Sequence, residues 1–161
     1  MSASIIDLCE GVVAALNGAA PGTFSETFSA VFELAPNYST MDAKSLRVVV
    51  TDAGGEIEPV ARAYLSFTDG VSLVVLWRVD SGATGIDTAK MKRALALLEE
   101  LVVFLALRPL AGYTPTGKMD RAGGAKDKTH YMAGNLDERL FAASVRVEYQ
   151  TKVSIREGGS S

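Results

Sequence analysis

The sequence predicts an α+β fold in which two helices pack on a single, mostly antiparallel sheet, with the element order α-β-β-(β)β-α-β. Residues 4–16 and 88–107 repeat apolar side chains with the 3.6-residue period of a helix. Other segments alternate apolar and polar residues as strands do, and residues 141–155 form the longest of these. There is no internal repeat, so residues 1–161 are predicted to form one domain.

The composition argues against most kinds of reactive site. A chain of 161 residues with 48% hydrophobic residues can bury a core, and a formal charge of -3 is unsuited to a protein built chiefly to hold nucleic acid. Cys9 and His130 are the only residues of their types. They are too few for an internal disulfide, a thiolate metal site or a metal site of several imidazoles within one chain. His130 lies in a segment expected to be flexible, which does not suit a usual catalytic triad. We therefore expect no enzyme, no cofactor and no metal site.

The first helix is predicted over residues 4–16. Its apolar stripe consists of Ile5, Leu8, Cys9, Val12 and Leu16. Ser2 or Ser4 can cap its start, and Asn17-Gly18 is suited to a left-handed stop. Cys9 lies on the apolar stripe, so we expect it to be a buried thiol.

The first strands follow this helix. We expect strands over residues 24–34 and 46–51, the second one closing at a turn over residues 52–55, followed by an irregular connection over 56–62. Two extended runs, 63–67 and 71–79, flank Asp69-Gly70. This pair predicts either a hairpin or a single strand with a bulge at Gly70, and both alternatives stay open. Residues 73–76 are apolar without alternation, which predicts burial on both faces.

The second helix is predicted from about residue 88 to 107, with Asp87 as its cap and Pro109 beyond its end. Its second half is apolar nearly all round, so it must be covered on more than one side. Either the first helix or a second subunit covers the extra face. Leu101 and Phe104 are therefore candidate interface residues.

Residues 111–135 are rich in glycine and lysine and have no periodic pattern. We expect either a mobile loop or an insertion that becomes ordered on a partner. Its candidate contact residues are Lys118, Arg121, Lys126 and Lys128. These cations fit an acidic protein surface, stay solvated or, with Tyr113 and Tyr131 nearby, contact nucleic acid.

The strand over residues 141–155 would span about 50 Å at roughly 3.3 Å per residue. A compact domain of this size is only about 40 Å across. Either a bulge bends the strand or one end leaves the domain. We expect its first half, through Tyr149, to complete the sheet, and its second half, with Lys152 and Arg156 on the polar side, to lie against a neighbouring subunit.

The order of the predicted elements and several short sequence segments along the whole chain also resemble a known family. The first helix ends in Ala-Leu-Asn at residues 15–17, and an aromatic strand leads to Leu-Ala-Pro-Asn-Tyr at 34–38. A buried strand at 73–79 precedes the long helix, and Leu-Asp-Glu-Arg-Leu-Phe at 136–141 introduces the final strand. This arrangement resembles the tail-terminator, or tail-completion, proteins of long-tailed bacteriophages. The basic insertion at 111–135 departs from the family pattern.

The resemblance implies a structural virion protein that forms a ring, typically of six subunits. Such a ring would terminate the tail tube and contact both the tail tube protein and a head-completion or neck protein. DNA would pass through its lumen without its sequence being read. The chain would be made in the host cytoplasm and reside in the tail or neck. Its N-terminus lacks the features of a signal peptide, and no segment suits a membrane span.

Two other functions stay open at this point. A head-completion or connector protein of the neck would show the same sequence features. A small nucleic-acid-binding α+β module would need a basic or aromatic sheet face, and the polar positions here carry mixed charge.

Overall fold

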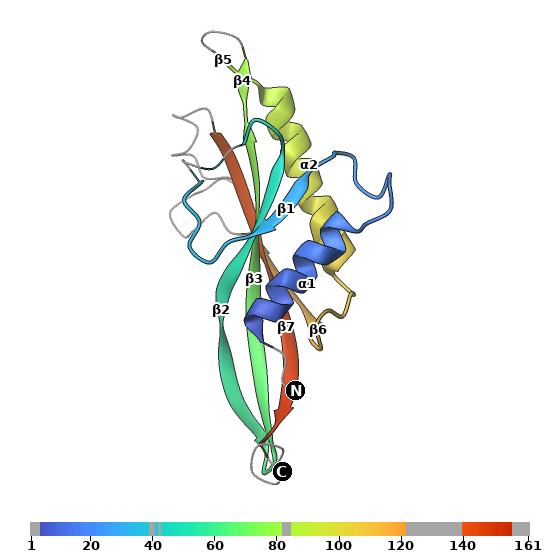
Figure 1. Cartoon of the computed structure of the whole chain (residues 1–161), viewed down its shortest axis with the longest axis vertical. Coiled ribbons are helices and arrows are strands. Elements are labelled where there is room, and N and C mark those ends of the chain that lie inside the picture. Colours follow the sequence, from blue (N-terminus) through green and yellow to red (C-terminus); the bar gives the residue numbers. More distant parts are fainter. Residues whose placement is uncertain (1–3, 39–40, 42, 82–84, 122–139, 156–161) are drawn as a thin grey trace.

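The computed structural model describes residues 4–38, 41, 43–81, 85–121 and 140–155 of the chain. Within these residues two helices and seven strands form (Figure 1). In chain order they are α1 (Ile5–Asn17), β1 (Ser29–Phe32), β2 (Arg47–Ala61), β3 (Tyr64–Arg78), β4 (Asp80–Ser81), β5 (Gly85–Ile86), α2 (Thr88–Leu105), β6 (Thr114–Arg121) and β7 (Leu140–Ser154).

The main sheet has five strands in the order β1-β2-β3-β7-β6. Only β1 and β2 pair in parallel, and the other neighbours are antiparallel. β4 and β5 form a separate two-stranded sheet. The predicted α+β class, with two helices and one mostly antiparallel sheet, is confirmed.

The core lies between the helices and one face of this sheet. The side chains of α1 and α2 pack on alternate residues of the central strands, and the largest of these include Leu8, Val12, Leu73, Leu97, Leu101 and Phe141. Each such side chain stabilises the fold by about 1.5–3 kcal/mol through its burial. A smaller cluster on the other face joins Val49, Val74, Leu76 and Leu140 to Ala43. The central strand is therefore covered on both faces, as the apolar run at 73–76 predicts.

The ends of α1 are set by local chemistry. The backbone N–H of Asp7 donates to the Ser4 hydroxyl at 3.1 Å, which confirms Ser4 as the cap. The expected left-handed stop is wrong, because Gly18 has φ -90° and its N–H bonds the Ala14 carbonyl. Cys9 is buried, as predicted, and this burial raises the pKa of its thiol to about 12.

The strand predicted over 24–34 is shorter in the structure. Only Ser29–Phe32 pair with β2. The side-chain amide of Asn17 bonds both the N–H and the carbonyl of Ala30 at 3.0 Å, and so joins α1 to β1. Phe24 lies outside the strand and packs edge-to-face on Phe28 and Phe104. The aromatic alternation therefore reflects packing on α2 more than sheet pairing.

The predictions for residues 52–79 need a larger correction. The turn over 52–55 and the irregular connection over 56–62 are wrong, because β2 continues through a bulge to Ala61. The chain turns at Arg62-Ala63 instead. Of the two alternatives for Asp69-Gly70, the hairpin is wrong and the single strand is confirmed, but the bulge lies on the neighbouring strand and not at Gly70. β3 passes through this pair without interruption, and the extra residue lies opposite it, on β2 between Asp52 and Gly55.

The second helix and the last strand match the expectations more closely. The side chain of Asp87 accepts from the N–H of Lys90 at 3.1 Å, which confirms the predicted cap. α2 ends at Leu105, two residues before the predicted limit. β7 confirms the long final strand with a shift of one residue at each end. The insertion predicted over 111–135 begins differently, since Thr114–Arg121 form the edge strand β6; residues 122–135 lie outside the described part of the chain.

Candidate interaction surfaces

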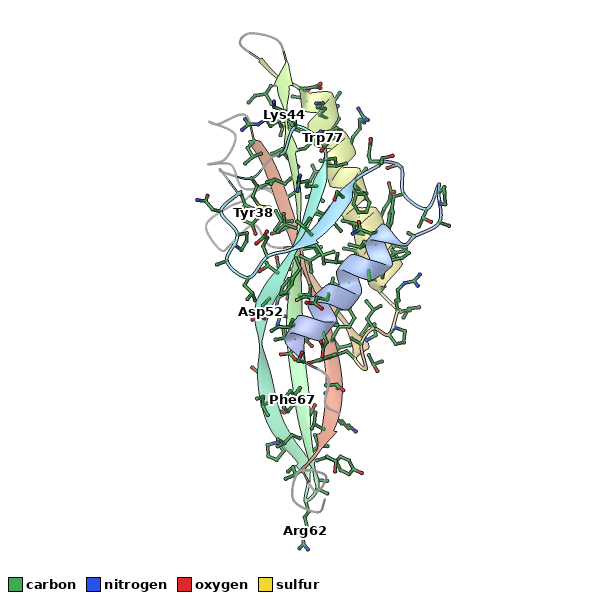
Figure 2. All side chains as sticks on the ribbon, viewed as in Figure 1. Tyr38, Lys44, Asp52, Arg62, Phe67 and Trp77 are labelled. Carbon is green, nitrogen blue, oxygen red and sulfur yellow. The ribbon has the colours of Figure 1, made fainter. Side chains whose placement is uncertain are left out.

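Three strands extend together past the helices and form what we call the arm, residues 55–69 and 149–155 (Figure 1). β3 and β7 pair without a register shift from Arg78–Leu140 to Tyr64–Ser154. β2 accompanies them to Ala61. Phe67 lies in the helix-free part and Arg62 at its tip, while Trp77 lies at the opposite end, near α2 (Figure 2). The sheet therefore does not end at Tyr149 as expected, because the second half of β7 pairs with β3 of the same chain as far as Ser154. The expected contact of this half with a neighbouring subunit stays a prediction.

The arm joins the body of the domain at a waist built from glycines and one arginine. Gly54 has φ 83°, a conformation that favours glycine, and it lies inside the bulge of β2. A β-carbon on Gly70 would collide with the guanidinium of Arg146. That guanidinium donates to the carbonyl of Gly54 and to the carboxylate of Glu148, each at 3.4 Å. Arg146 therefore lies across β3 and holds the bulged strand beside it.

The two faces of the arm differ in polarity. Cross-strand partners share a face, and on the helix side the register pairs Ile57 with Phe67 and Leu65 with Val153. Ile57 is 63% exposed, and Phe67, Leu65 and Val153 are only half-buried. The other face carries Glu56, Glu58, Ser66, Thr68, Gln150 and Lys152. The arm is therefore amphipathic, with its apolar face lying on the helix side but beyond the helices.

A buried polar pair closes the lower end of the core. The Tyr113 hydroxyl donates to the Asp69 carboxylate at 2.6 Å, and Tyr113 itself is almost fully buried. Burial, followed by the Asp69 contact, raises the pKa of Tyr113 well above its usual value. Burial also raises the pKa of Tyr149. These shifts, like that of Cys9, favour the protonated form, which is the opposite of an activated nucleophile.

The outer side of α2 presents a second apolar surface. A hollow of about 550 Å³ lies between α2 and β6, and we call it the α2–β6 groove. It is lined by Leu95, Leu98, Glu99, Val102, Val103, Met119 and Val145. Val103 is 77% exposed at its rim. Exposed aliphatic side chains around a hollow are typical of a contact surface.

The first turns of α2 carry cations around Trp77. Lys90 and Arg93 lie 4.8 Å and 5.1 Å from the centre of the indole ring, which is 8% exposed. Arg93 also bonds the Glu26 carboxylate, with Nη2 to Oε2 at 2.8 Å, and this bond lowers the pKa of Glu26. Trp77 is thus a core residue covered by Lys90 and Arg93, and both cations also have hydrogen-bond partners.

The predicted contact residues lie in different parts of the molecule. Leu101 is wrong as an interface residue because it is fully buried within the core. Phe104 is half-buried under Phe24 and the guanidinium of Arg108, 4.0 Å from its ring. Lys118 on β6 and Lys152 on the arm are exposed. Arg121 ends β6, and Lys126, Lys128 and Arg156 lie outside the described residues.

Sequence reasoning missed the residues that dominate both apolar surfaces. Ile57 fell in a segment predicted to be irregular, and Met119 in the insertion. The local signal at Ile57 is its alternation with Glu56 and Glu58, which is typical of a strand. The turn predicted at 52–55 hides this signal, because it implies that the strand has already ended. No local signal places Met119 beside α2, because that contact depends on β6 pairing with β7.

Two absences hold for the described residues alone. Among them, no three histidine, cysteine or acidic side chains gather closely enough to bind a metal ion. Nor does any helix in this part of the chain have the length and apolarity needed to cross a membrane. No known protein-family model matches the chain, and no curated protein matches it either.

Proposed function

We propose that this chain is a structural virion protein whose copies form a ring, of six subunits, that terminates the tail tube of a long-tailed bacteriophage and joins it to the neck. The observation that carries the proposal is the arm. A three-stranded extension with one apolar face is costly to leave in water, and contact with a neighbouring copy would cover it. The resemblance of the chain to tail-terminator proteins supports the same assignment.

The proposed role requires surfaces and no reaction. A terminator must contact its own copies, the last ring of tail tube protein and a neck protein, and DNA crosses its lumen without specific contacts. The molecule is long in one direction (Figure 1). Its arm and its α2 side therefore lie far enough apart to serve different neighbours. The raised pKa values of Cys9 and Tyr113 favour their unreactive forms and are compatible with a purely structural protein.

The proposal is tested by adding the purified chain to polymerising tail tube protein of the same phage and imaging the product. We expect tubes of limited length with a ring of this chain at one end. Native mass spectrometry of the isolated chain should give a closed oligomer at high concentration. A chain that stays monomeric at every concentration, with and without tubes, would rule the proposal out. A ring located in intact particles away from the tube would instead identify a head-completion or connector protein.

A further inference from the structure

The side of α2 that faces away from the core carries a stripe of exposed residues. Their spacing alternates between three and four positions, which places them on one side of the helix. The stripe consists of Ala89, Lys92, Ala96, Glu99 and Val103, all of which are exposed. A stripe of this length is a surface that a second helix can contact lengthwise.

A hollow lies on each side of this stripe. The α2–β6 groove, of about 550 Å³, lies on one side, and a hollow of about 480 Å³ beside Thr23 and Phe24 lies on the other. Glu99 and Val103 line both hollows and therefore form the ridge between them. Helices pack by placing the ridge of one helix in the groove of another. The outer side of α2 has this shape, with the 77% exposed Val103 as its apolar contact.

We propose that α2 of one copy packs antiparallel on α2 of a second copy, about a twofold axis at Ala96. Positions equally distant from residue 96 then lie opposite each other, so Val103 contacts Ala89 of the second copy. Lys92 precedes the axis by four residues and Glu99 follows it by three. At about 1.5 Å of rise per residue, these two side chains lie at nearly the same height and attract each other.

The charges of α2 favour this occupant. Residues 88–98 carry three bases and no acid, and residues 99–107 carry two acids and no base. An antiparallel pair places the basic half of one helix against the acidic half of the other, and it also opposes the two helix dipoles. A parallel pair would place Lys92 beside Lys92 and Glu99 beside Glu99, which weakens association.

The arm is less suited to the same surface. Among its paired strand residues, only Asp69 carries a charge on the apolar face, and this carboxylate bonds Tyr113. The arm would therefore bring no cation to Glu99, which lines both hollows. A second copy of α2 brings Lys92, and it is the better match in charge.

This inference goes beyond the proposed ring. The contact is isologous, because the same patch of both copies meets, and such a contact joins two copies but cannot by itself close a ring of six. Copies held in a ring by their arms would use α2 to pair with copies of a second ring. The isolated chain would use it to form a dimer.

The first test is disulfide cross-linking in a Cys9→Ala background, which contains no other cysteine. Ala96→Cys places two thiols on the twofold axis, so mild oxidation should give a covalent dimer on a non-reducing gel. Leu107→Cys is the matched control, because Leu107 is 91% exposed near the end of the described helix. Its two copies would lie about 33 Å apart along the helices and should stay monomeric on the gel. An absent dimer with Ala96→Cys, or an equal dimer with Leu107→Cys, would overturn the proposal.

A mixture of variants tests the antiparallel register. Ala89→Cys and Val103→Cys should each give little covalent dimer alone, because the paired thiols would lie about 21 Å apart along the helices. Their mixture should give a dimer that contains one chain of each kind, which intact-mass spectrometry identifies. Dimers formed by each variant alone, with none specific to the mixture, would show a parallel contact and contradict the proposed axis.

A charge exchange gives an independent check. Lys92→Glu and Glu99→Lys should each weaken the pairing about tenfold at low salt, because the twofold axis repeats each lost attraction. The double variant should recover most of the wild-type affinity, measured by sedimentation velocity over a series of concentrations. Additive losses in the double variant would contradict the pairing of these residues.

A substitution on the arm separates this contact from the proposed function. Ile57→Glu charges the arm at a side chain that is 63% exposed, and it should leave the Ala96→Cys cross-link unchanged. Loss of the cross-link in this variant, with its fold intact by circular dichroism, would show that the arm holds the copies together and would overturn the proposal. If rings cap tail tubes and Ala96→Cys gives no cross-link, the pairing fails and the terminator role stands. If the cross-link forms and the chain never binds tubes, the terminator role fails and the pairing stands.

Discussion

The body and the arm are built from the same three strands, yet they are covered very differently. In the body, Leu73 of β3 lies under the helices and Val74 lies in the opposite cluster, so both faces are buried. Eight to ten residues earlier on the same strand, Leu65 is half-exposed and Tyr64 is 47% exposed. The pairing of β3 with β7 continues unchanged between these two places. Hydrogen-bonded pairing of strands therefore does not require that their side chains be buried. The arm is paired like the body, but its side chains remain partly exposed.

This difference predicts that the body determines stability whereas the arm determines association. Leu101→Ala removes a fully buried side chain from the body and should lower the free energy of unfolding by about 2–5 kcal/mol. Ile57→Ala in the arm should lower it by less than about 1 kcal/mol, because the side chain is already 63% exposed. Urea denaturation of dilute, monomeric protein measures both changes. Equal losses at the two sites would show that the arm is part of the folding core and would break the comparison.

The waist between the two regions allows a second, smaller test. Gly70→Ala should destabilise the fold by about 1 kcal/mol, because the added β-carbon displaces the flexible end of the Arg146 side chain from Gly54 and Glu148. Combining it with Arg146→Ala removes the collision, so the double variant should lose less than the sum of the two single losses. A double-mutant cycle by urea denaturation measures this coupling. Strict additivity would mean that Arg146 does not hold the waist against Gly70.

The sequence predicts best those elements whose signals are local. α1, with Ser4 as its cap, α2, with Asp87 as its cap, and the long strand β7 all follow from periodicity and capping chemistry. The α+β class follows from them, because two amphipathic helices need a sheet to pack on. These interactions lie within a few residues of each other along the chain, so a pattern reveals them directly.

The arm could not be predicted in this way, because tertiary pairing overrides its local signals. The glycines at residues 54 and 55 resemble a turn, but the strand continues through them: Gly54 lies in a bulge opposite Gly70, and Gly55 pairs with Asp69. Arg146, which lies 92 residues from Gly54 in the chain, holds this bulge. The buried position of Leu101 was missed for a related reason. The second half of α2 is apolar on all sides, which predicts that it is covered. The apolar pattern does not identify which of these sides faces the core.

The smallest expected effect concerns the buried thiol of the body, for which the arm has no counterpart. Burial raises the pKa of Cys9 from 9.0 to about 12, so the thiol ionises in the unfolded chain before it does in the fold. The resulting stability is fully present below pH 9 and is lost as the pH rises from 9 toward 12. Between pH 9 and 10 the loss from this group should be about 1 kcal/mol. Cys9→Ala should flatten that part of the stability curve, measured by urea denaturation under reducing conditions. An unchanged slope in the variant would show that the alkaline loss comes from another group, with Tyr113 and Tyr149, whose pKa values are also raised, as the next to substitute.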